Sequence, residues 1–220
     1  FNTIKYFWEI LCIGALNTSL EKASALIFYN VLIQIFYKGN FASTIIVPKY
    51  GLSESIINPA ELFIKINGGK IIPSETVKEP TIENQEIVAV ISDTNSHTDF
   101  DYVISALPLY ALEKIIPLKT LEINLILQYS TILNIHLWIN ENKFSEKFYG
   151  FFDSQLHWIF VKENHINIVI SNADHMVEKS KEDIFNLVMN ELENFISISA
   201  DEVHHYKIIK EKRATFIPSI

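Results

Sequence analysis

Two pairs of histidine and tryptophan are the residues whose types and spacing could carry chemistry. They are His136 with Trp138 and His157 with Trp158, and each pair falls in a run that predicts a strand. Tryptophan ring faces stabilise positive charge, so a cavity that they line would suit an apolar ligand that develops cationic character. Core packing is the competing interpretation of both tryptophans, because large aromatic side chains are highly buried on average.

The other reactive side chains match no known catalytic or metal-binding arrangement. No Ser–His–Asp or Cys–His spacing stands out, so the sequence identifies no catalytic residue. Cys12 lies in an apolar helical run and is interpreted as an inert buried thiol. His204 and His205 are adjacent in a predicted strand and would point to opposite faces, so we expect no metal site.

Composition limits the class of protein. The chain has 220 residues, of which 49% are hydrophobic, enough to bury a sizeable core in one or two domains. The net charge of −8 without a basic stripe excludes nucleic acid as an expected partner. A single cysteine excludes a disulfide framework and indicates a reducing, cytoplasmic compartment. The sequence begins at Phe1 in mid-pattern, and we interpret it as a fragment.

The stretch from Asn67 to Pro108 organises the expected fold. Gly68-Gly69 ends an amphipathic helix, because glycine adopts the left-handed conformation without a steric penalty. Strands are expected at residues 70–74, 76–82 and 87–92. The almost wholly apolar run Tyr102–Leu107 predicts a parallel strand buried on both faces. Ligands bind beyond the carboxyl ends of such strands.

The flanking segments predict helices first and a strand-rich part afterwards. A helix is expected at residues 4–16. Thr18 and Glu21 are expected to form a capping box that opens a second helix. Asn58-Pro59 is expected to start a third helix. That third helix should turn Leu62, Phe63 and Ile66 inward. Ser180 should cap a helix that covers one face of a sheet, whose strands are expected at residues 130–139, 148–152, 157–161, 166–172 and 203–210.

Several motifs in order resemble a known family. The pattern GGKI…SETV…EIVAV…FDYVISALP resembles the middle of the FAD-dependent amine oxidase and phytoene desaturase superfamily. The flanks resemble its squalene-associated branch, the hydroxysqualene dehydroxylase family. They comprise residues 7–12, 15–18, 23–25 and 51–53 with Pro48, and residues 136–138, 157–160 and 211–216.

The resemblance implies a fold and a division of the chain. It implies an α/β fold, α+β in the second part, made of a Rossmann-like FAD/NAD(P)-binding part without the N-terminal βαβ unit and a mixed-sheet substrate domain. Residues 1–50 would be the helical part of the substrate domain and residues 51–116 part of the FAD-binding domain. Residues 117–210 would form the substrate-binding sheet, and residues 211–220 would return toward the FAD domain.

The resemblance also implies site residues. FAD is the expected cofactor, contacted by Val77, Ala106, Leu107 and Pro108. The sequence has six glycines and no G-x-G-x-x-G, so the main phosphate contacts are not expected here. Substrate contacts are expected from Trp8, Asn17, Trp138, His157 and Trp158. Glu9 lies in the same motif and could protonate a departing hydroxyl if burial raised its pKa, although a solvated or capping role is the default.

The reaction that the resemblance implies is the reductive removal of a hydroxyl group from hydroxysqualene, giving squalene for hopanoid synthesis. A carotenoid or phytoene-type desaturase, or another enzyme of the flavin amine oxidase type, is the alternative. A non-catalytic lipid-binding module is the alternative from another class. The expected partner is an apolar isoprenoid, and the protein could touch the inner membrane peripherally to collect it.

Overall fold

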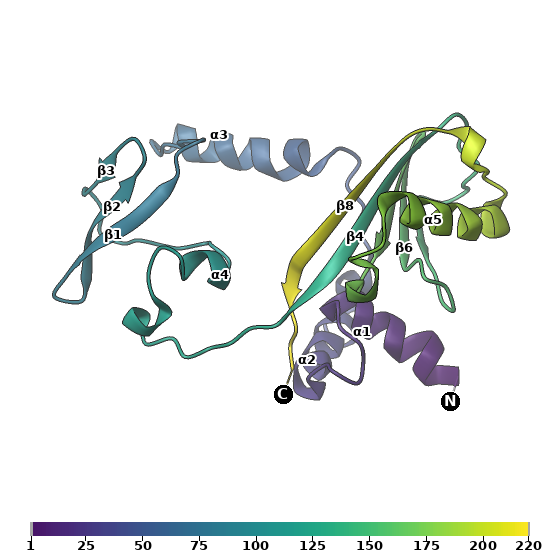
Figure 1. The fold of residues 1–220 in the computed structure, drawn as a ribbon, viewed down its shortest axis with the longest axis horizontal. Coiled ribbons are helices and arrows are strands. Elements are labelled where there is room, and N and C mark those ends of the chain that lie inside the picture. The colour runs from purple at the N-terminus through teal and green to yellow at the C-terminus, as the bar shows by residue number, and fades with distance from the viewer. Residues whose placement is uncertain (1, 220) are drawn as a thin grey trace. The chain divides into compact units, whose positions relative to one another are not determined.

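The computed structural model describes residues 2–219, which divide into two compact units. Unit 1 combines the residues up to Val47 with those from Gln128 onward, and unit 2 runs from Pro48 to Leu127. Figure 1 labels the main helices and strands of both units. The fold is mixed α/β with two antiparallel sheets, which confirms the predicted fold class.

Unit 1 is built on a five-stranded antiparallel sheet in the order β5-β6-β7-β4-β8. The strands are β4 (Tyr129–Ile139), β5 (Phe148–Gly150), β6 (Trp158–Lys162), β7 (His165–Ile170) and β8 (Val203–Phe216). All five correspond to predicted strands. Strand β8 continues to Phe216, past the predicted end at Lys210, so residues 211–216 still pair with β4.

One face of this sheet is covered by helix α5 (Lys181–Ile196), as predicted (Figure 1). Ser180 caps the helix in a capping box with Asp183. The apolar residues of α5 recur at helical spacing and those of the strands alternate, so both sets point into one core. The fully buried members include Leu133, Ile135, Leu137, Ile159, Ile166, Ile168, Ile184, Val188 and Leu192. Two short 3-10 segments, Asp174–Met176 and Ala200–Glu202, flank α5.

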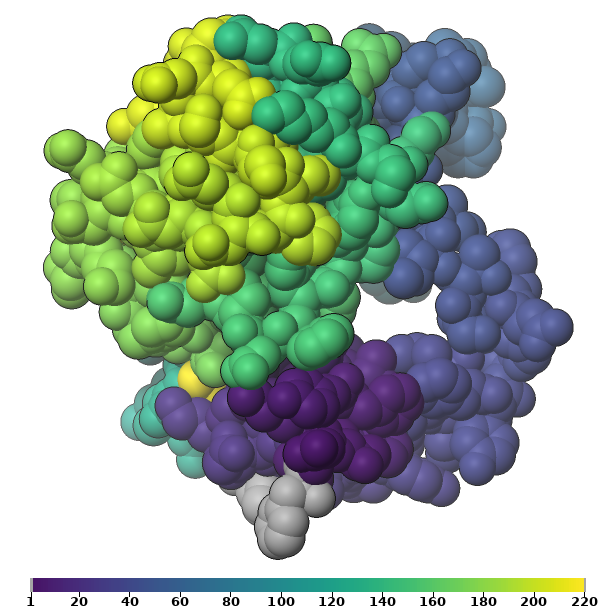
Figure 2. Space-filling view, turned by 90° about the vertical axis from the view of Figure 1, so that its right-hand side faces the viewer, coloured from purple at the N-terminus to yellow at the C-terminus, as the bar shows by residue number. Residues whose placement is uncertain are grey.

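The N-terminal helices pack at one end of the same sheet. A π-helical turn (η1, Ile4–Trp8) leads into α1 (Glu9–Leu16), and α2 (Ala25–Phe36) follows, with a 3-10 turn at Asn40–Ser43. Figure 2 shows the first helical segment, in purple, directly beneath the sheet segment drawn in green. Across residues 2–219 no helix is both long and apolar enough to cross a bilayer.

The predicted capping box of Thr18 and Glu21 is wrong. Asn17 ends α1 in the left-handed conformation, with φ of 49°. The residues that follow form turns before α2 begins. Thr18 Oγ1 donates a hydrogen bond to the carbonyl of Leu16 instead of capping a helix. Ser24 is the actual cap, because its side chain accepts a bond from the N–H of Ile27.

Unit 2 contains short helices and a three-stranded antiparallel sheet in the order β1-β2-β3. Its elements are η3 (Ser53–Ile57), α3 (Asn58–Ile66), β1 (Val77–Glu83), β2 (Glu86–Ser92), β3 (Ser96–His97), α4 (Leu109–Leu112) and a 3-10 turn at Leu118–Leu121. Gly68 ends α3 with φ of 82°, as predicted. Asn84 and Gln85 both have positive φ, which gives the two-residue hairpin turn between β1 and β2.

Three expectations for unit 2 are wrong. Residues 70–74 form no strand, and Tyr102–Leu107 is neither a strand nor buried, with Tyr102 88% and Ile104 91% exposed. Leu62, Phe63 and Ile66 of α3 are 61%, 66% and 72% exposed instead of inward. An apolar run becomes a buried parallel strand only when strands pair beside it, and no strand among residues 2–219 pairs with this one.

Candidate functional site

The face of the five-stranded sheet that points away from α5 carries aromatic and histidine side chains in rows. Directly paired residues on antiparallel strands point to the same side of a sheet. The observed register therefore places Trp138 and Trp158 on one surface, which we call the second face. It comprises Trp158, Phe160 and Lys162 of β6, His165, Asn167 and Val169 of β7, Asn134, His136 and Trp138 of β4, and His205, Lys207 and Ile209 of β8.

Two histidines of the second face form a hydrogen-bonded pair. His136 Nδ1 lies 3.2 Å from His165 Nε2, and the two rings are inclined by only 8°. The ring of Trp138 lies 4.8 Å from that of His165 and 4.9 Å from that of His205. Burial, followed by the charge of Lys207, lowers the pKa of His136.

The same forces act on the second member of the pair. Burial is the main cause that lowers the pKa of His165, and the neighbouring His136 and Lys162 add to it. At neutral pH the pair is therefore predominantly uncharged. One nitrogen of the contact donates its proton and the other accepts it, which fixes the relative tautomers of the two rings.

Asn167 adds an unsatisfied polar atom to this region. It lies in the same row as His136, directly opposite it across β4 and β7. Its Oδ1 is buried and has no hydrogen-bond partner among the residues that the structure describes. Such an acceptor costs about 1–3 kcal/mol when it is left without a donor, so a bound hydroxyl or water would stabilise it.

Trp158 joins the sheet to the N-terminal helices. Its ring is parallel to that of Phe148 within 12°, with 5.6 Å between the centroids. A Cβ atom on Gly14 would lie 2.6 Å from Trp158 Cζ2, and one on Gly150 would lie 2.8 Å from Cζ3. The indole is therefore held between α1 and β5. Trp158 thus packs between these segments and also lies on the second face.

A cavity of about 430 Å³ opens at this end of the sheet. It brings together three residues that the sequence singled out, Glu9, His157 and Trp158. An ion pair of Lys5 with Asp153, 2.5 Å long, and a hydrogen bond from Ser154 to Glu191, 2.7 Å long, border it. The remaining lining residues are Ile10, Ile13, Phe151, Phe152 and Gln155.

His157 has a fixed tautomer in this cavity. Its Nδ1 accepts a hydrogen bond from the backbone N–H of Ser171, 2.9 Å away. Because a backbone N–H only donates, Nδ1 carries no proton and the neutral ring is protonated at Nε2. Burial, followed by the charge of His175, lowers the pKa of His157. The side chain is thus a neutral donor at ordinary pH.

The other two predicted substrate residues lie apart from the second face. Trp8 packs among the N-terminal helices, with its ring 4.9 Å from Phe7 and 6.3 Å from Phe28. Asn17 is only 4% exposed and uses both ends of its amide in hydrogen bonds to other segments. Substrate contact by these two side chains stays a prediction.

The predicted cofactor residues all lie in unit 2. Val77 begins β1 opposite Ser92 and is 41% exposed. Residues 106–108 lie outside any strand, with a bend at Leu107, which is 45% exposed. The N–H of Leu107 donates to Ser105 Oγ, and the carbonyl of Pro108 accepts hydrogen bonds from Ala111 and Leu112. Contact of these segments with FAD stays a prediction.

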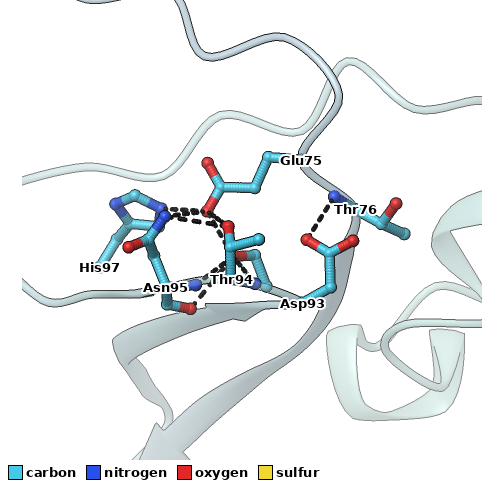
Figure 3. Close-up of polar contacts among 7 residues, drawn as sticks. Glu75, Thr76, Asp93, Thr94, Asn95 and His97 are labelled. Atoms are coloured by element: carbon cyan, nitrogen blue, oxygen red, sulfur yellow. Dashed lines mark hydrogen bonds and ion pairs between the residues drawn. The ribbon is translucent and has the colours of Figure 1, made fainter.

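A polar cluster next to Val77 was not predicted (Figure 3). Glu75 Oε1 accepts hydrogen bonds from the side chains of Ser92, Thr94, Asn95 and His97. These bonds, that from Ser92 above all, lower the pKa of Glu75 to about 2. The sequence signal was limited to a polar loop, because nothing in it pairs that loop with a carboxylate about twenty residues earlier.

No group of three or more potential metal ligands is found within residues 2–219. Cys12 is fully buried, as predicted, and burial is the main cause that raises its pKa to about 11. Its thiol donates a weak hydrogen bond to the carbonyl of Thr18.

Comparison with known proteins yields matches along nearly the whole chain. The family model described as flavin containing amine oxidoreductase matches residues 10–208. Hydroxysqualene dehydroxylase of Zymomonas mobilis subsp. mobilis is 24% identical over 209 residues, which cover 93% of this chain and 49% of the relative. The enzyme of the same name from Rhodopseudomonas palustris is 24% identical over 210 residues, with 94% and 49% covered. The chain thus spans about half the length of these curated relatives.

Solved structures share the fold. An oxidoreductase from Methanosarcina mazei superposes with a TM-score of 0.74 at 19% identity, covering 96% of this chain and 53% of that one. A cofactor-binding redesign of putrescine oxidase superposes with a TM-score of 0.65 at 15% identity, covering 90% and 48%.

The family model covers most of the chain, and the solved structures share its arrangement of a mixed sheet with helices. The chain belongs to the flavin containing amine oxidoreductase family.

The described residues fit FAD only in part. None of the six glycines forms a glycine-rich loop at a helix N-terminus, which is the usual cradle of a pyrophosphate. What fits is peripheral, namely Val77 and Leu107, which are both partly exposed. When bound, the flavin supplies hydride chemistry that no side chain of this chain can provide.

Proposed function

We propose that the protein containing this chain is an FAD-dependent oxidoreductase that acts on an apolar isoprenoid lipid. Its reaction is the reductive dehydroxylation of hydroxysqualene to squalene, a step toward hopanoids. The relatives named hydroxysqualene dehydroxylase support this substrate class.

The second face of the sheet is the observation that carries this proposal. It presents Trp158 and Phe160 at one side and Trp138 at the other, with a neutral histidine pair between them. Aromatic faces pack against an isoprenoid chain and stabilise a carbocation by cation–π attraction. Loss of a hydroxyl from an allylic carbon builds up such a positive charge.

The chain's own residues would bind and orient the substrate. With substrate packed against them, the aromatic side chains would shield the reacting carbon from water, which would otherwise capture a carbocation. Polar groups on the same face, His136, His165 and Asn167, would receive the one polar group of an otherwise apolar molecule. A surface with few polar groups in fixed places is typical of small-molecule sites.

The experiment is an assay of the full-length, flavin-loaded protein with hydroxysqualene and reduced flavin. Squalene should accumulate in proportion to flavin oxidised, and omission of the reductant should stop it. Protein that purifies without flavin absorbance, or that consumes no hydroxysqualene, would refute the proposal.

A desaturase of the carotenoid type is the second candidate. The same aromatic face would hold a polyene precursor, and hydride would flow from substrate to flavin. The histidine pair argues against it, because dehydrogenation of a hydrocarbon leaves no hydroxyl for a polar group to receive. Incubation of the oxidised enzyme with phytoene distinguishes the two, since only a desaturase would bleach the flavin.

A further inference from the structure

We infer that His136 and His165 together form the proton donor that converts the departing hydroxyl of the substrate into water. The inference rests on the proposed function and assigns it a chemical step. Nothing in the sequence marks these two residues as a pair, because they are 29 positions apart and belong to different strands.

The geometry favours a relay over two separate histidines. The 3.2 Å contact between His136 Nδ1 and His165 Nε2 uses one nitrogen of each ring. The remaining nitrogens, His136 Nε2 and His165 Nδ1, have no hydrogen-bond partner in the part of the chain that the structure describes. A proton taken up at one outer nitrogen can therefore be released from the other through a shift of the shared proton.

The residues beside the pair could bind the hydroxyl group of a substrate. His136 faces Asn167 across the strands, and the buried Oδ1 of that residue lacks a donor. His165 faces Trp138, whose ring lies 4.8 Å away. A hydroxyl at this point would have a proton donor on one side and an aromatic ring on the other.

The charged groups around the pair tune its proton affinity. Lys207 of β8 shares the row of His136, and Lys162 of β6 shares the row of His165. His205 of β8 faces Trp138, and a carboxylate on the same side of the sheet, Glu211 of β8, lies opposite Ile132, one row beyond Asn134. Two lysines and burial disfavour the charged pair, so its protonated form is a strong acid toward an oxygen lone pair.

The step balances in atoms and charge. The carbon–oxygen bond of the substrate breaks with both electrons going to oxygen, and one imidazole proton joins that oxygen, which leaves as water. The carbon gains a hydride from the reduced flavin that the proposed function requires, giving a carbon–hydrogen bond. The pair then recovers its proton from solvent.

The test compares His165→Gln and His136→Gln with His204→Gln in the full-length, flavin-loaded protein. His204 is a matched control, because it lies on β8, is exposed and does not belong to the second face. Each pair variant should lower kcat for hydroxysqualene by about 10²-fold or more, with flavin content unchanged. In the wild type kcat should fall as pH rises above the pair's depressed pKa, and this slope should vanish in both pair variants.

The outcomes separate the inference from the proposed function. Wild type that makes no squalene overturns both. Wild type that makes squalene while the pair variants keep its kcat and pH profile overturns the inference alone. An equal loss in His204→Gln would assign the effect to a general weakening of the sheet and would also overturn it.

A second measurement applies if the pair variants fail to fold. Nitrogen NMR of wild-type protein labelled at histidine should show His136 and His165 taking up one shared proton in a single titration. Two independent titrations would contradict the relay.

Discussion

The side chain of Asn17 accepts a hydrogen bond from the backbone N–H of Asn172, with 2.5 Å between the two heavy atoms. Its other end, Nδ2, donates to Thr215 Oγ1 over 3.0 Å. One amide thus joins the end of α1 to the segments that follow β7 and end β8. The left-handed backbone of Asn17 is what aims the side chain there, and asparagine tolerates that conformation well.

Replacement of Asn17 should therefore destabilise the protein. Asn17→Gly keeps the left-handed backbone and removes both hydrogen bonds, at a cost of about 1–3 kcal/mol in the free energy of unfolding. Asn17→Ala should cost about 1 kcal/mol more, because a Cβ is disfavoured at this φ. Denaturant unfolding measures both. Asn30→Ala, on the exposed side of α2, is the control and should change little; a loss in it as large as that in Asn17→Gly would refute this account.

The contact between Gly14 and Trp158 determines whether Gly14→Ala stabilises or destabilises the protein. Alanine normally stabilises a helix by about 1 kcal/mol relative to glycine. At Gly14, however, the new Cβ would lie 2.6 Å from the indole, and overpacking of this kind costs about 1–3 kcal/mol. Gly14→Ala should therefore lower the melting temperature. In a Trp158→Leu background the clash is absent, so the same change should raise it, and a lowering there would contradict the packing explanation.

The strands and the main helix of unit 1 were predictable because their signals are local. Alternation of apolar residues, as at Leu133, Ile135 and Leu137, predicts a strand with one buried face regardless of its partner. Ser180 with Asp183 likewise fixes the start of α5 within four residues. These patterns also placed Trp138 and Trp158 on strands.

The contacts between distant segments could not be predicted in this way. Whether His136 meets His165 depends on the register of β4 against β7, and a shift of one residue would send one ring to the opposite face. The prediction that Tyr102–Leu107 is a buried strand was wrong for a related reason. Its composition indicates an interior strand, but the sequence of a strand does not supply the neighbours that bury it.

The Glu75 cluster predicts a pH-dependent stability in unit 2. Hydrogen bonds from Ser92 and its neighbours lower the pKa of Glu75 from its ordinary 4.5 to about 2 in the folded chain. A depressed pKa means that the charged form stabilises the fold. That stabilisation is complete above the unfolded pKa and is lost as pH falls toward the folded one.

Hydrogen exchange of the amides around Asn95 measures this effect locally. Protection should decline between about pH 4.5 and pH 2 in the wild type, and Glu75→Gln should already be poorly protected at higher pH and show little further change. Glu79→Gln, an exposed carboxylate on β1, is the matched control and should follow the wild type. A wild-type profile in Glu75→Gln would show that the carboxylate does not organise the loop.

Cys12 should be unreactive in the folded protein. The thiol is fully buried, and a pKa of about 11 leaves only about one part in a thousand as thiolate at about pH 8. A free cysteine has a pKa of about 8.5, so alkylation of Cys12 should be slower than in the unfolded chain by more than about 100-fold. Mass spectrometry of the peptide containing Cys12, with and without denaturant, measures both rates. Rapid labelling of the native protein would mean that α1 separates readily from the sheet, and the Asn17 and Trp158 contacts would then be too weak to hold it there.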